Sequence, residues 1–353
     1  MRETVISRTS AGDVEIIIDK GIDTGAEILK KHKPCHVLIV SDDSVFALYG
    51  EKTKESIEAA GFMVDTFVFP HGEESKNIDT LNSILEYAAS KEMSRTDLFV
   101  ALGGGVVGDI TGFASAVFLR GVDYVQVPTT VLAAVDSSVG GKTAVDLNAG
   151  KNLIGAFHQP LEVLLDVDVF DTLPEETYTE GLAEAIKYGM IKDKKLYDLF
   201  KENDIDSLDM IPVCKRCIEI KADVVEKDEF DNGERRLLNF GHTPGHAVEI
   251  LSKFGISHGH AVAIGMVIMT RLSERTGEIP QGSTDEFIEV LKKYNLPTEC
   301  SYNNKELTAH SKVDKKRKGS KIGLVMLHSI GKAYVKETDV DDIERLYAIG
   351  LNM

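Results

Sequence analysis

The chain has 353 residues, of which 43% are hydrophobic, so it can bury a large core, and its length favours two domains over one. Its formal net charge of −17 excludes general binding to nucleic acid or to anionic membranes, because both would be repelled. The N-terminus lacks the basic start and apolar core of a signal peptide, and no apolar run could span a bilayer, so we expect a cytoplasmic protein.

The first half of the chain alternates strand-like and helical segments. One helical pattern runs to about residue 60, and a second covers about 77–91. The strand patterns cover 36–43, 63–70, 97–105, 122–130 and 163–169. This alternation predicts βαβ units and a mostly parallel sheet, which is an α/β fold.

Helical patterns dominate the second half. Thr172 is a plausible N-cap for the first helix, with Pro174 near its first turn. The segment 321–337 is an exception that could form a hairpin or a strand pair. We therefore predict an α/β domain in residues 1–170 and an all-α domain in residues 171–353.

Cys214 and Cys217 form a CxxC motif, but apolar residues around them recur at helical spacing and no second pair completes a zinc site. We interpret both as buried helix positions. The cysteines at 35, 214, 217 and 300 are too few and too scattered for a disulfide framework.

Gly103, Gly105 and Gly108 match GxGxxG between a predicted strand and a predicted helix. Glycine lets the backbone approach a pyrophosphate, whose charge a helix N-terminus favours. The motif lacks a clear ribose-binding acid about 20 residues further on, so a glycine-lined tight turn remains the alternative to a nucleotide site.

The segment DSSVGGKT resembles the end of a phosphate-binding P-loop, but Asp136 stands where that loop needs glycine. An NTPase is therefore not expected. Lys142 follows two glycines and could hold a phosphate or carboxylate, or could simply be solvated.

A metal site is indicated by histidine density, since four of the ten histidines lie between residues 242 and 260. Glu184 and Lys187 share one helical face, so a carboxylate and a cation could project together. Two histidines and one carboxylate form a familiar zinc set. Spacing favours His242 with His246, although Pro244 suits a helix starting near residue 243 and would leave His242 outside it. The alternative to a metal site is that these histidines are buried in a helical core with their ring nitrogens hydrogen-bonded.

The segments that carry a family resemblance are GGGVVGDITGFAS, FLRGVDYVQVPTTVLAAVDSSVGGKTAVD, GKNLIGAFHQP, GLAEAIKYG, RRLLNFGHTPGH and HGHAVAIGM. Together they resemble the 3-dehydroquinate synthases of the sugar phosphate cyclase superfamily, from about residue 35 to 337. The resemblance implies an NAD-binding α/β domain, a helical metal- and substrate-binding domain and a cytoplasmic homodimer. It also implies two cofactors, NAD and one divalent metal ion, zinc or cobalt.

The resemblance implies Glu184, His242 and His258 as metal ligands, and it makes His246 a candidate for proton handling. Other positions match family residues that hold the substrate: Arg120, Asp136, Lys142, Asn152, Lys187, Lys221, Asp231, Arg235, Asn239 and either Lys315 or Lys316 in the basic run 312–321. The positions that match NAD-binding residues are Asp42, Glu73, Lys76, Gly104, Gly105, Asp109, Thr129, Thr130, Asp136, Lys142, Lys151 and Thr172.

The implied reaction belongs to the shikimate route to aromatic compounds. It converts 3-deoxy-D-arabino-heptulosonate 7-phosphate into 3-dehydroquinate and phosphate through transient oxidation at C5, phosphate elimination, reduction and aldol closure. Three residues depart from the family pattern: Asp231 replaces glutamate, Pro244 replaces a bulky apolar residue, and His260 stands where HGE is usual. We expect unchanged function with shifted pH or metal dependence.

Three other functions compete with this one. A sister cyclase would act on sedoheptulose 7-phosphate or glucose 6-phosphate, but Arg235, Asn239 and His246 match the pocket for a carboxylate-bearing substrate. A metal-dependent polyol or glycerol-phosphate dehydrogenase would not need so many cations. A catalytically silent NAD-binding module should have lost some of Lys142, Lys187 and Lys221.

Overall fold

The computed structural model describes residues 2–231, 233–311 and 320–351. Contacts group the chain into two compact units, of which the first comprises Met1–Leu173 and Met210–Phe230 and the second Pro174–Asp209 and Asp231–Met353. The segment Met210–Phe230, which we assigned from sequence to the second domain, thus groups with the first unit. A functional division near residue 170 remains a prediction.

A seven-stranded sheet forms the centre of the first unit, in the order β1-β2-β9-β6-β5-β3-β4. All neighbouring strands pair in parallel except β1 and β2, which confirms the predicted mostly parallel sheet. The β1–β2 hairpin was not predicted. The strands are β1 (Glu3–Thr9), β2 (Gly12–Asp19), β3 (His36–Asp42), β4 (Met63–Phe69), β5 (Leu98–Gly103), β6 (Asp123–Pro128) and β9 (Glu162–Asp166).

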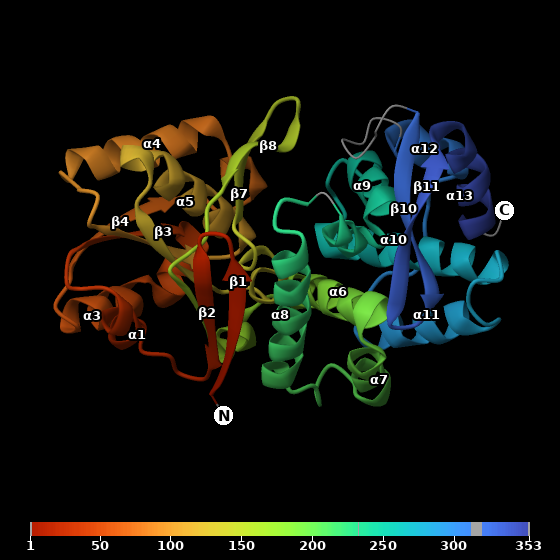
Figure 1. The fold of residues 1–353 in the computed structure, drawn as a ribbon, viewed down its shortest axis with the longest axis horizontal. Helices are drawn as coiled ribbons and strands as arrows, with labels where there is room; N and C mark the ends of the chain where they lie inside the picture. The colour runs from red at the N-terminus through yellow and green to blue at the C-terminus, as the bar shows by residue number, and fades with distance from the viewer. Residues whose placement is uncertain (1, 232, 312–319, 352–353) are drawn as a thin grey trace. The chain divides into compact units, whose positions relative to one another are not determined.

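Helices cover both faces of this sheet, with α4 and α5 on one face and α1 and α3 on the other (Figure 1). The helices of the unit are α1 (Thr24–Lys31), α2 (Asp43–Val45), α3 (Glu51–Ala59), α4 (Ile78–Ser90), α5 (Gly105–Val117) and α8 (Met210–Lys227). Helix α8 packs against β1 and against the short segment η4 (Ala133–Ser137), and Cys214 and Cys217 are buried in it, as predicted.

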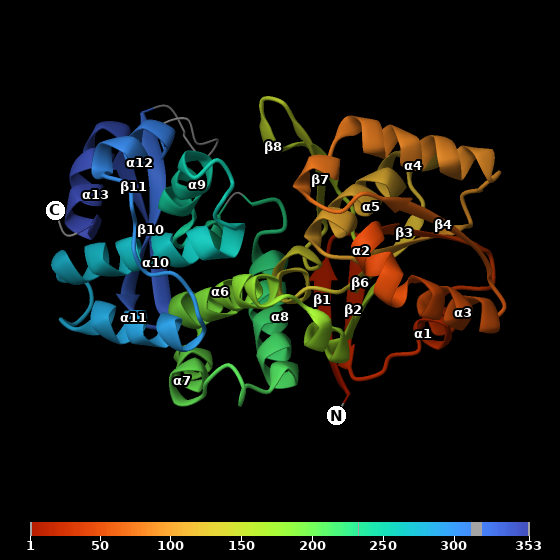
Figure 2. The ribbon, with the colours of Figure 1, turned by 180° about the vertical axis from the view of Figure 1, so that it is seen from behind.

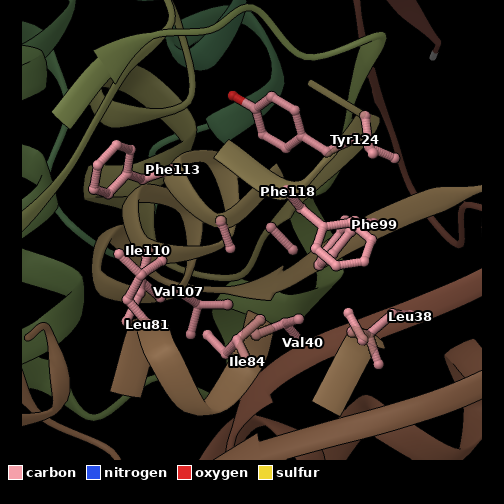
Figure 3. Packing of buried hydrophobic residues seen from close by; sticks show 14 of the residues in the cluster. Leu38, Val40, Leu81, Ile84, Phe99, Val107, Ile110, Phe113, Phe118 and Tyr124 are labelled. Atoms are coloured by element: carbon pink, nitrogen blue, oxygen red, sulfur yellow. The ribbon is translucent and has the colours of Figure 1, made fainter. Parts of the chain in front are cut away.

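A hydrophobic core lies on each face of the sheet. Successive residues of β3 pack into one core and then the other, because side chains alternate across a strand. Leu38 and Val40 pack with Ile84 of α4 and Ile110 of α5 (Figure 3). Val37 and its alternate neighbours belong to the other core. Each fully buried aliphatic side chain stabilises the fold by roughly 1.5–3 kcal/mol. Strand β3 is therefore apolar on both faces, and this pattern made it recognisable in the sequence.

A separate hairpin, β7 (Lys142–Leu147) and β8 (Gly150–Phe157), extends away from the sheet within this unit (Figure 1). The backbone N–H of Asp146 donates to the carbonyl of Lys76 at 2.8 Å and anchors the hairpin.

Helix α10 (His258–Arg275) is the centre of the second unit, where it contacts α6, α9, α11, α13 and β10 (Figure 2). The other helices are α6 (Glu175–Lys192), α7 (Lys194–Glu202), α9 (His242–Leu251), α11 (Ser283–Lys293), α12 (Asn304–Ser311) and α13 (Ile343–Leu351). The hairpin proposed for 321–337 is present as β10 (Lys321–Ser329) and β11 (Lys332–Asp339). Over its described residues, the second unit is thus helical apart from this hairpin.

Two helix starts differ from expectation. Helix α6 begins at Glu175 after Pro174, and Thr172 does not cap it, since its hydroxyl donates to the Val169 carbonyl at 2.9 Å. Helix α9 begins at His242 rather than at residue 243, because Gly241 takes a left-handed φ of 78° and turns the chain immediately before it. Among the helices in the described ranges, none has the length and apolar character that a membrane crossing requires.

Candidate functional site

Three helices of the second unit bring Glu184, His242 and His258 together, from α6, α9 and α10. Glu184 Oε1 lies 3.5 Å from His242 Nε2 and 3.9 Å from His258 Nε2. The three ligand atoms meet the distance requirement for a group that could hold one metal ion. These are the residues that the family resemblance implied as ligands.

The donor set fits a divalent metal. Two ligands about 2.1 Å from a tetrahedral zinc ion lie about 3.4 Å from each other, close to the spacing seen here. Glu184 Oε1 is buried and has no hydrogen-bond partner among the described residues. A buried carboxylate oxygen without a donor is costly, and a bound cation would remove that cost.

Lys187 orients the Glu184 carboxylate. Its Nζ donates to Glu184 Oε2, and both side chains are only 1% exposed. The two residues are three apart on α6, so they lie on one face of the helix as predicted. With Oε2 occupied by the ammonium group, Oε1 is the oxygen left for a metal.

Each histidine ligand has a partner for its other ring nitrogen. His242 Nδ1 lies 3.2 Å from the Phe240 carbonyl, and His258 Nδ1 lies 3.2 Å from Glu249 Oε2. A carbonyl and a carboxylate can only accept, so each Nδ1 carries the proton and each Nε2 keeps its lone pair. Burial lowers the pKa of His258, but the hydrogen bond and charge of Glu249, with help from the Glu184 carboxylate, raise it overall.

Glu180 fixes the start of α10 against α6. Its Oε1 accepts the backbone N–H of Gly259 at 3.1 Å. A Cβ at Gly259 would lie 2.1 Å from the Glu180 carbonyl, so only glycine permits this close approach. The contact places His258, the preceding residue, beside Glu184.

The other two histidines have different surroundings. The ring centroid of His246 lies 5.5 Å from that of His242 and 5.8 Å from that of His258. His246 also belongs to a second group that could hold a metal, with Glu249 and His258. His260 Nε2 lies 2.9 Å from Thr179 Oγ1, so this departure from the family pattern is tied to α6.

Arg235 and Asn239 lie on the short helical segment η6 (Glu234–Asn239), and Arg235 is 3% exposed. Ion pairs hold η6 at two points, Glu234 with Lys192 of α6 and Arg236 with Glu337 of β11. Asp231 precedes this segment with a left-handed φ of 60°. Lys315 and Lys316 lie outside the described residues.

The glycine-rich turn lies at the carboxyl end of β5, as predicted. Gly104 is the N-cap of α5 and Gly105 its first residue. A Cβ at Gly104 would lie 3.1 Å from Thr130 Cγ2, so the absence of a side chain keeps the turn open. Thr129 follows the neighbouring strand β6, and its buried Oγ1 has no hydrogen-bond partner among the described residues. A buried donor and a helix N-terminus suit an anionic ligand such as a pyrophosphate.

Lys76 connects several predicted NAD-binding and substrate-binding residues. It is 5% exposed, and its Nζ donates to Asp109 Oδ2 at 2.6 Å and to Asn152 Oδ1 at 2.7 Å. Burial lowers the pKa of Lys76, but the carboxylates of Asp109 and Glu73 raise it overall. Glu73 Oε1 also lies 3.6 Å from Lys151 Nζ. The ammonium group of Lys76 therefore stays charged and orders the β7–β8 hairpin near its turn, where Asn152 lies two residues after Gly150.

In the first unit, the buried Lys221 of α8 forms an ion pair with the partly exposed Asp136 of η4, with 2.8 Å between Nζ and Oδ1. Lys142 is exposed at the start of β7. Arg120 is exposed on a turn with a left-handed φ of 72°. Asp42 ends β3 and caps α2 through the Val45 N–H at 2.9 Å. Thr172 shares a hydrogen bond with the hydroxyl of Tyr49.

Glu249 and Glu180 were absent from the residues predicted from sequence. Glu249 lies three residues after His246 on the same helix, which was the available signal. Its partner is nevertheless His258 of the next helix, so only the packing of α9 against α10 identifies its contact.

Comparison with known proteins gives matches over both halves. The family models described as 3-dehydroquinate synthase N-terminal and C-terminal match residues 66–180 and 181–317. The 3-dehydroquinate synthase of Clostridium botulinum (strain Alaska E43 / Type E3) is 44% identical over 348 residues, which cover 97% of this chain and 99% of the relative.

Two solved structures share the fold. One is 2-epi-5-epi-valiolone synthase from Streptomyces hygroscopicus subsp. jinggangensis 5008 with NAD⁺ and Zn²⁺ bound, at a TM-score of 0.87, 23% identity and coverage of 96% of this chain and 97% of that chain. The other is 2-deoxy-scyllo-inosose synthase complexed with carbaglucose-6-phosphate, NAD⁺ and Co²⁺. Its TM-score is 0.85 and its identity 23%, and the match covers 98% of this chain and 99% of that chain. The two matched halves, together with 44% identity over 97% of the chain, show that the chain belongs to the 3-dehydroquinate synthase family.

Proposed function

We propose that this chain converts 3-deoxy-D-arabino-heptulosonate 7-phosphate into 3-dehydroquinate and phosphate with one resident divalent metal and a recycled NAD. Its activity is that of a 3-dehydroquinate synthase, a phosphorus–oxygen lyase of the shikimate pathway. Within the structure, the observation that supports the metal-assisted route best is the buried Glu184 Oε1, which faces the Nε2 atoms of His242 and His258.

Glu184, His242 and His258 are the residues that would hold the metal. When bound, the metal would polarise a substrate hydroxyl, and NAD would take up a hydride and later return it. The chain's own contribution is to fix the ligands beforehand. Lys187 neutralises part of the carboxylate charge and leaves one oxygen available. The Phe240 carbonyl keeps the proton of His242 on Nδ1.

The residues that we assign to NAD belong to the first unit. The N-terminus of α5 at Gly104 and Gly105 would receive the pyrophosphate, because backbone N–H groups and the helix dipole favour an anion there. Lys76 and Asp109 would order the adjacent backbone through their buried ion pair. Other residues assigned to NAD are Asp42, Glu73, Thr129, Thr130, Asp136, Lys142, Lys151 and Thr172.

The substrate carries a carboxylate, several hydroxyls and a phosphate, so it needs cations and amides in fixed positions. We assign this role to Arg120, Asp136, Lys142, Asn152, Lys187, Lys221, Asp231, Arg235, Asn239 and one of Lys315 and Lys316. Lys221 and Arg235 are 5% and 3% exposed, so their charges act in a poorly hydrated environment where they are strong. His246, beside the proposed ligands, is assigned to proton handling near the substrate.

Phosphate release and the absorbance of NADH test the proposal together. The purified protein would be supplied with catalytic NAD, zinc or cobalt, and the heptulosonate phosphate. We expect stoichiometric phosphate release without accumulated NADH, because the hydride returns to the substrate. Accumulating NADH would instead identify a polyol or glycerol-phosphate dehydrogenase. Turnover of sedoheptulose 7-phosphate alone would identify a sister cyclase.

We further propose a cytoplasmic location and a homodimer, both from the family resemblance. Sedimentation equilibrium of the purified protein should give twice the chain mass of 38.7 kDa. A single-chain mass across the assay concentrations would contradict the homodimer.

A further inference from the structure

We propose that Glu249 is a positioning residue of the metal centre, which holds His258 in the tautomer and ring orientation that a metal ligand requires. This inference rests on the ligand set of the proposed function and deepens it. None of the residues matched through the family resemblance corresponds to Glu249.

The contact is specific and protected from water. Glu249 lies on α9 and is 5% exposed, while His258 is the first residue of α10. The distance from Glu249 Oε2 to His258 Nδ1 is 3.2 Å. An ionised carboxylate has no proton to donate, so the hydrogen bond requires the proton on Nδ1. That proton position leaves the lone pair of Nε2 on the side of Glu184 Oε1, 3.9 Å away.

The negative charge of Glu249 contributes a second effect. A carboxylate bonded to the far nitrogen of a ligand imidazole makes that imidazole a stronger donor and restricts rotation of the ring. Loss of such a partner typically lowers metal affinity by about 10–100-fold. At the other histidine ligand, Nδ1 of His242 lies 3.2 Å from the Phe240 carbonyl, which is a neutral acceptor.

A rival arrangement uses Glu249 as a ligand itself. His246, Glu249 and His258 form a second group whose atoms could hold a metal ion. In that arrangement His258 would bind through Nδ1, and Glu184 would take no part. The oxygen of Glu184 would then stay buried without a hydrogen-bond donor, which disfavours this alternative.

Equilibrium binding of Co²⁺ to the metal-free protein, measured by competition with a chromophoric chelator, separates these roles without any assay of turnover. The variants are Glu249→Gln, Glu249→Ala, Glu184→Gln and His246→Gln. The matched control is Glu274→Gln, on α10, where the carboxylate accepts the N–H groups of Gly282 and Thr284. Thermal unfolding of each metal-free variant checks its fold.

We expect Glu249→Gln, which keeps an acceptor oxygen but no charge, to weaken Co²⁺ binding about 10-fold, and Glu249→Ala about 100-fold. The visible absorption bands of bound Co²⁺ should keep their positions in Glu249→Gln, because the ligands are unchanged. Partial rescue by glutamine would show that the hydrogen bond matters, and it remains measurable if the alanine variant does not fold. Glu274→Gln should stay within about 2-fold of the parent.

Parental affinity in Glu249→Gln and Glu249→Ala would overturn the inference while leaving the ligand set intact. Altered Co²⁺ bands in Glu249→Gln, with affinity lost in His246→Gln and kept in Glu184→Gln, would make Glu249 a ligand. That second outcome would overturn the ligand set of the proposed function as well, so the two failures are distinguishable.

Discussion

Replacing Glu162 with glutamine is expected to stabilise the protein at and above neutral pH. Glu162 begins β9, is 0% exposed, and has no hydrogen-bond partner for either carboxylate oxygen among the described residues. It lies opposite Glu15 of the parallel strand β2. Burial raises the pKa of Glu162 from an ordinary 4.5 to about 7. The charges of Lys31 and Lys30 lower this pKa, and those of Glu27 and Glu15 raise it.

The sign of the effect follows from this raised pKa. The folded protein holds the proton of Glu162 more tightly than the unfolded chain, so unfolding becomes easier as the pH rises from 4.5 to about 7. Each unit of pKa corresponds to about 1.4 kcal/mol, so the limiting loss at high pH is on the order of 3 kcal/mol. Most of this loss falls between pH 5 and pH 8. Glutamine is neutral throughout and removes the slope.

Urea unfolding of the parent and of Glu162→Gln at pH 5, 6, 7 and 8 measures this difference. The control is Asp97→Asn in the same unit. Burial raises the pKa of Asp97, but the N–H groups of Ser94 and His36 lower it overall. The stability that Asp97 provides is lost only as the pH falls below its ordinary value of 3.8. The control should therefore be destabilised by a similar amount at all four pH values.

The reasoning about Glu162 would be refuted by a constant difference between Glu162→Gln and the parent from pH 5 to pH 8. Such a result would mean that the Glu162 carboxyl group titrates alike in the folded and unfolded chain.

Two further changes test the candidate metal centre. Lys187→Met leaves the Glu184 carboxylate buried without its cation, so we expect a loss of about 3–5 kcal/mol in the metal-free protein. Added Zn²⁺ should raise the melting temperature of this variant more than that of the parent. An equal rise in both proteins would contradict the role of Lys187 as the cation that pairs with Glu184. His260→Glu removes the hydrogen bond to Thr179 and places a carboxylate two residues after His258. We expect this variant to catalyse the same reaction with a shifted pH–rate profile. Coincident profiles of variant and parent would show that residue 260 does not set the pH dependence.

The α/β half was predictable because its strands carry a local signal. Buried parallel strands are apolar on both faces, so β3 and β5 appear as short continuous apolar runs between helical patterns. The β1–β2 hairpin was missed although its buried residues, such as Val5, alternate with exposed ones. Its neighbour in the sheet, β9, is more than a hundred residues further along the chain, and no local pattern indicates such a pairing.

Helix α8 shows why a single boundary along the sequence could not assign every element to its unit. Its helical pattern from Met210 to Lys227 was recognisable, but it packs with the first unit. Its burial against β1 depends on side chains distant in sequence.

The sequence by itself determined the buried parallel strands and the helices between them, the glycine-rich turn after β5 and the presence of metal-binding residue types, because each depends on residues a few positions apart. Spacing alone favoured His246 beside His242, since residues four apart share a helical face. Tertiary structure decided that His258 faces Glu184 Oε1 and that Glu249 accepts from its far nitrogen. These contacts join three different helices, and their distances depend on how α6, α9 and α10 pack rather than on the spacing within any one of them.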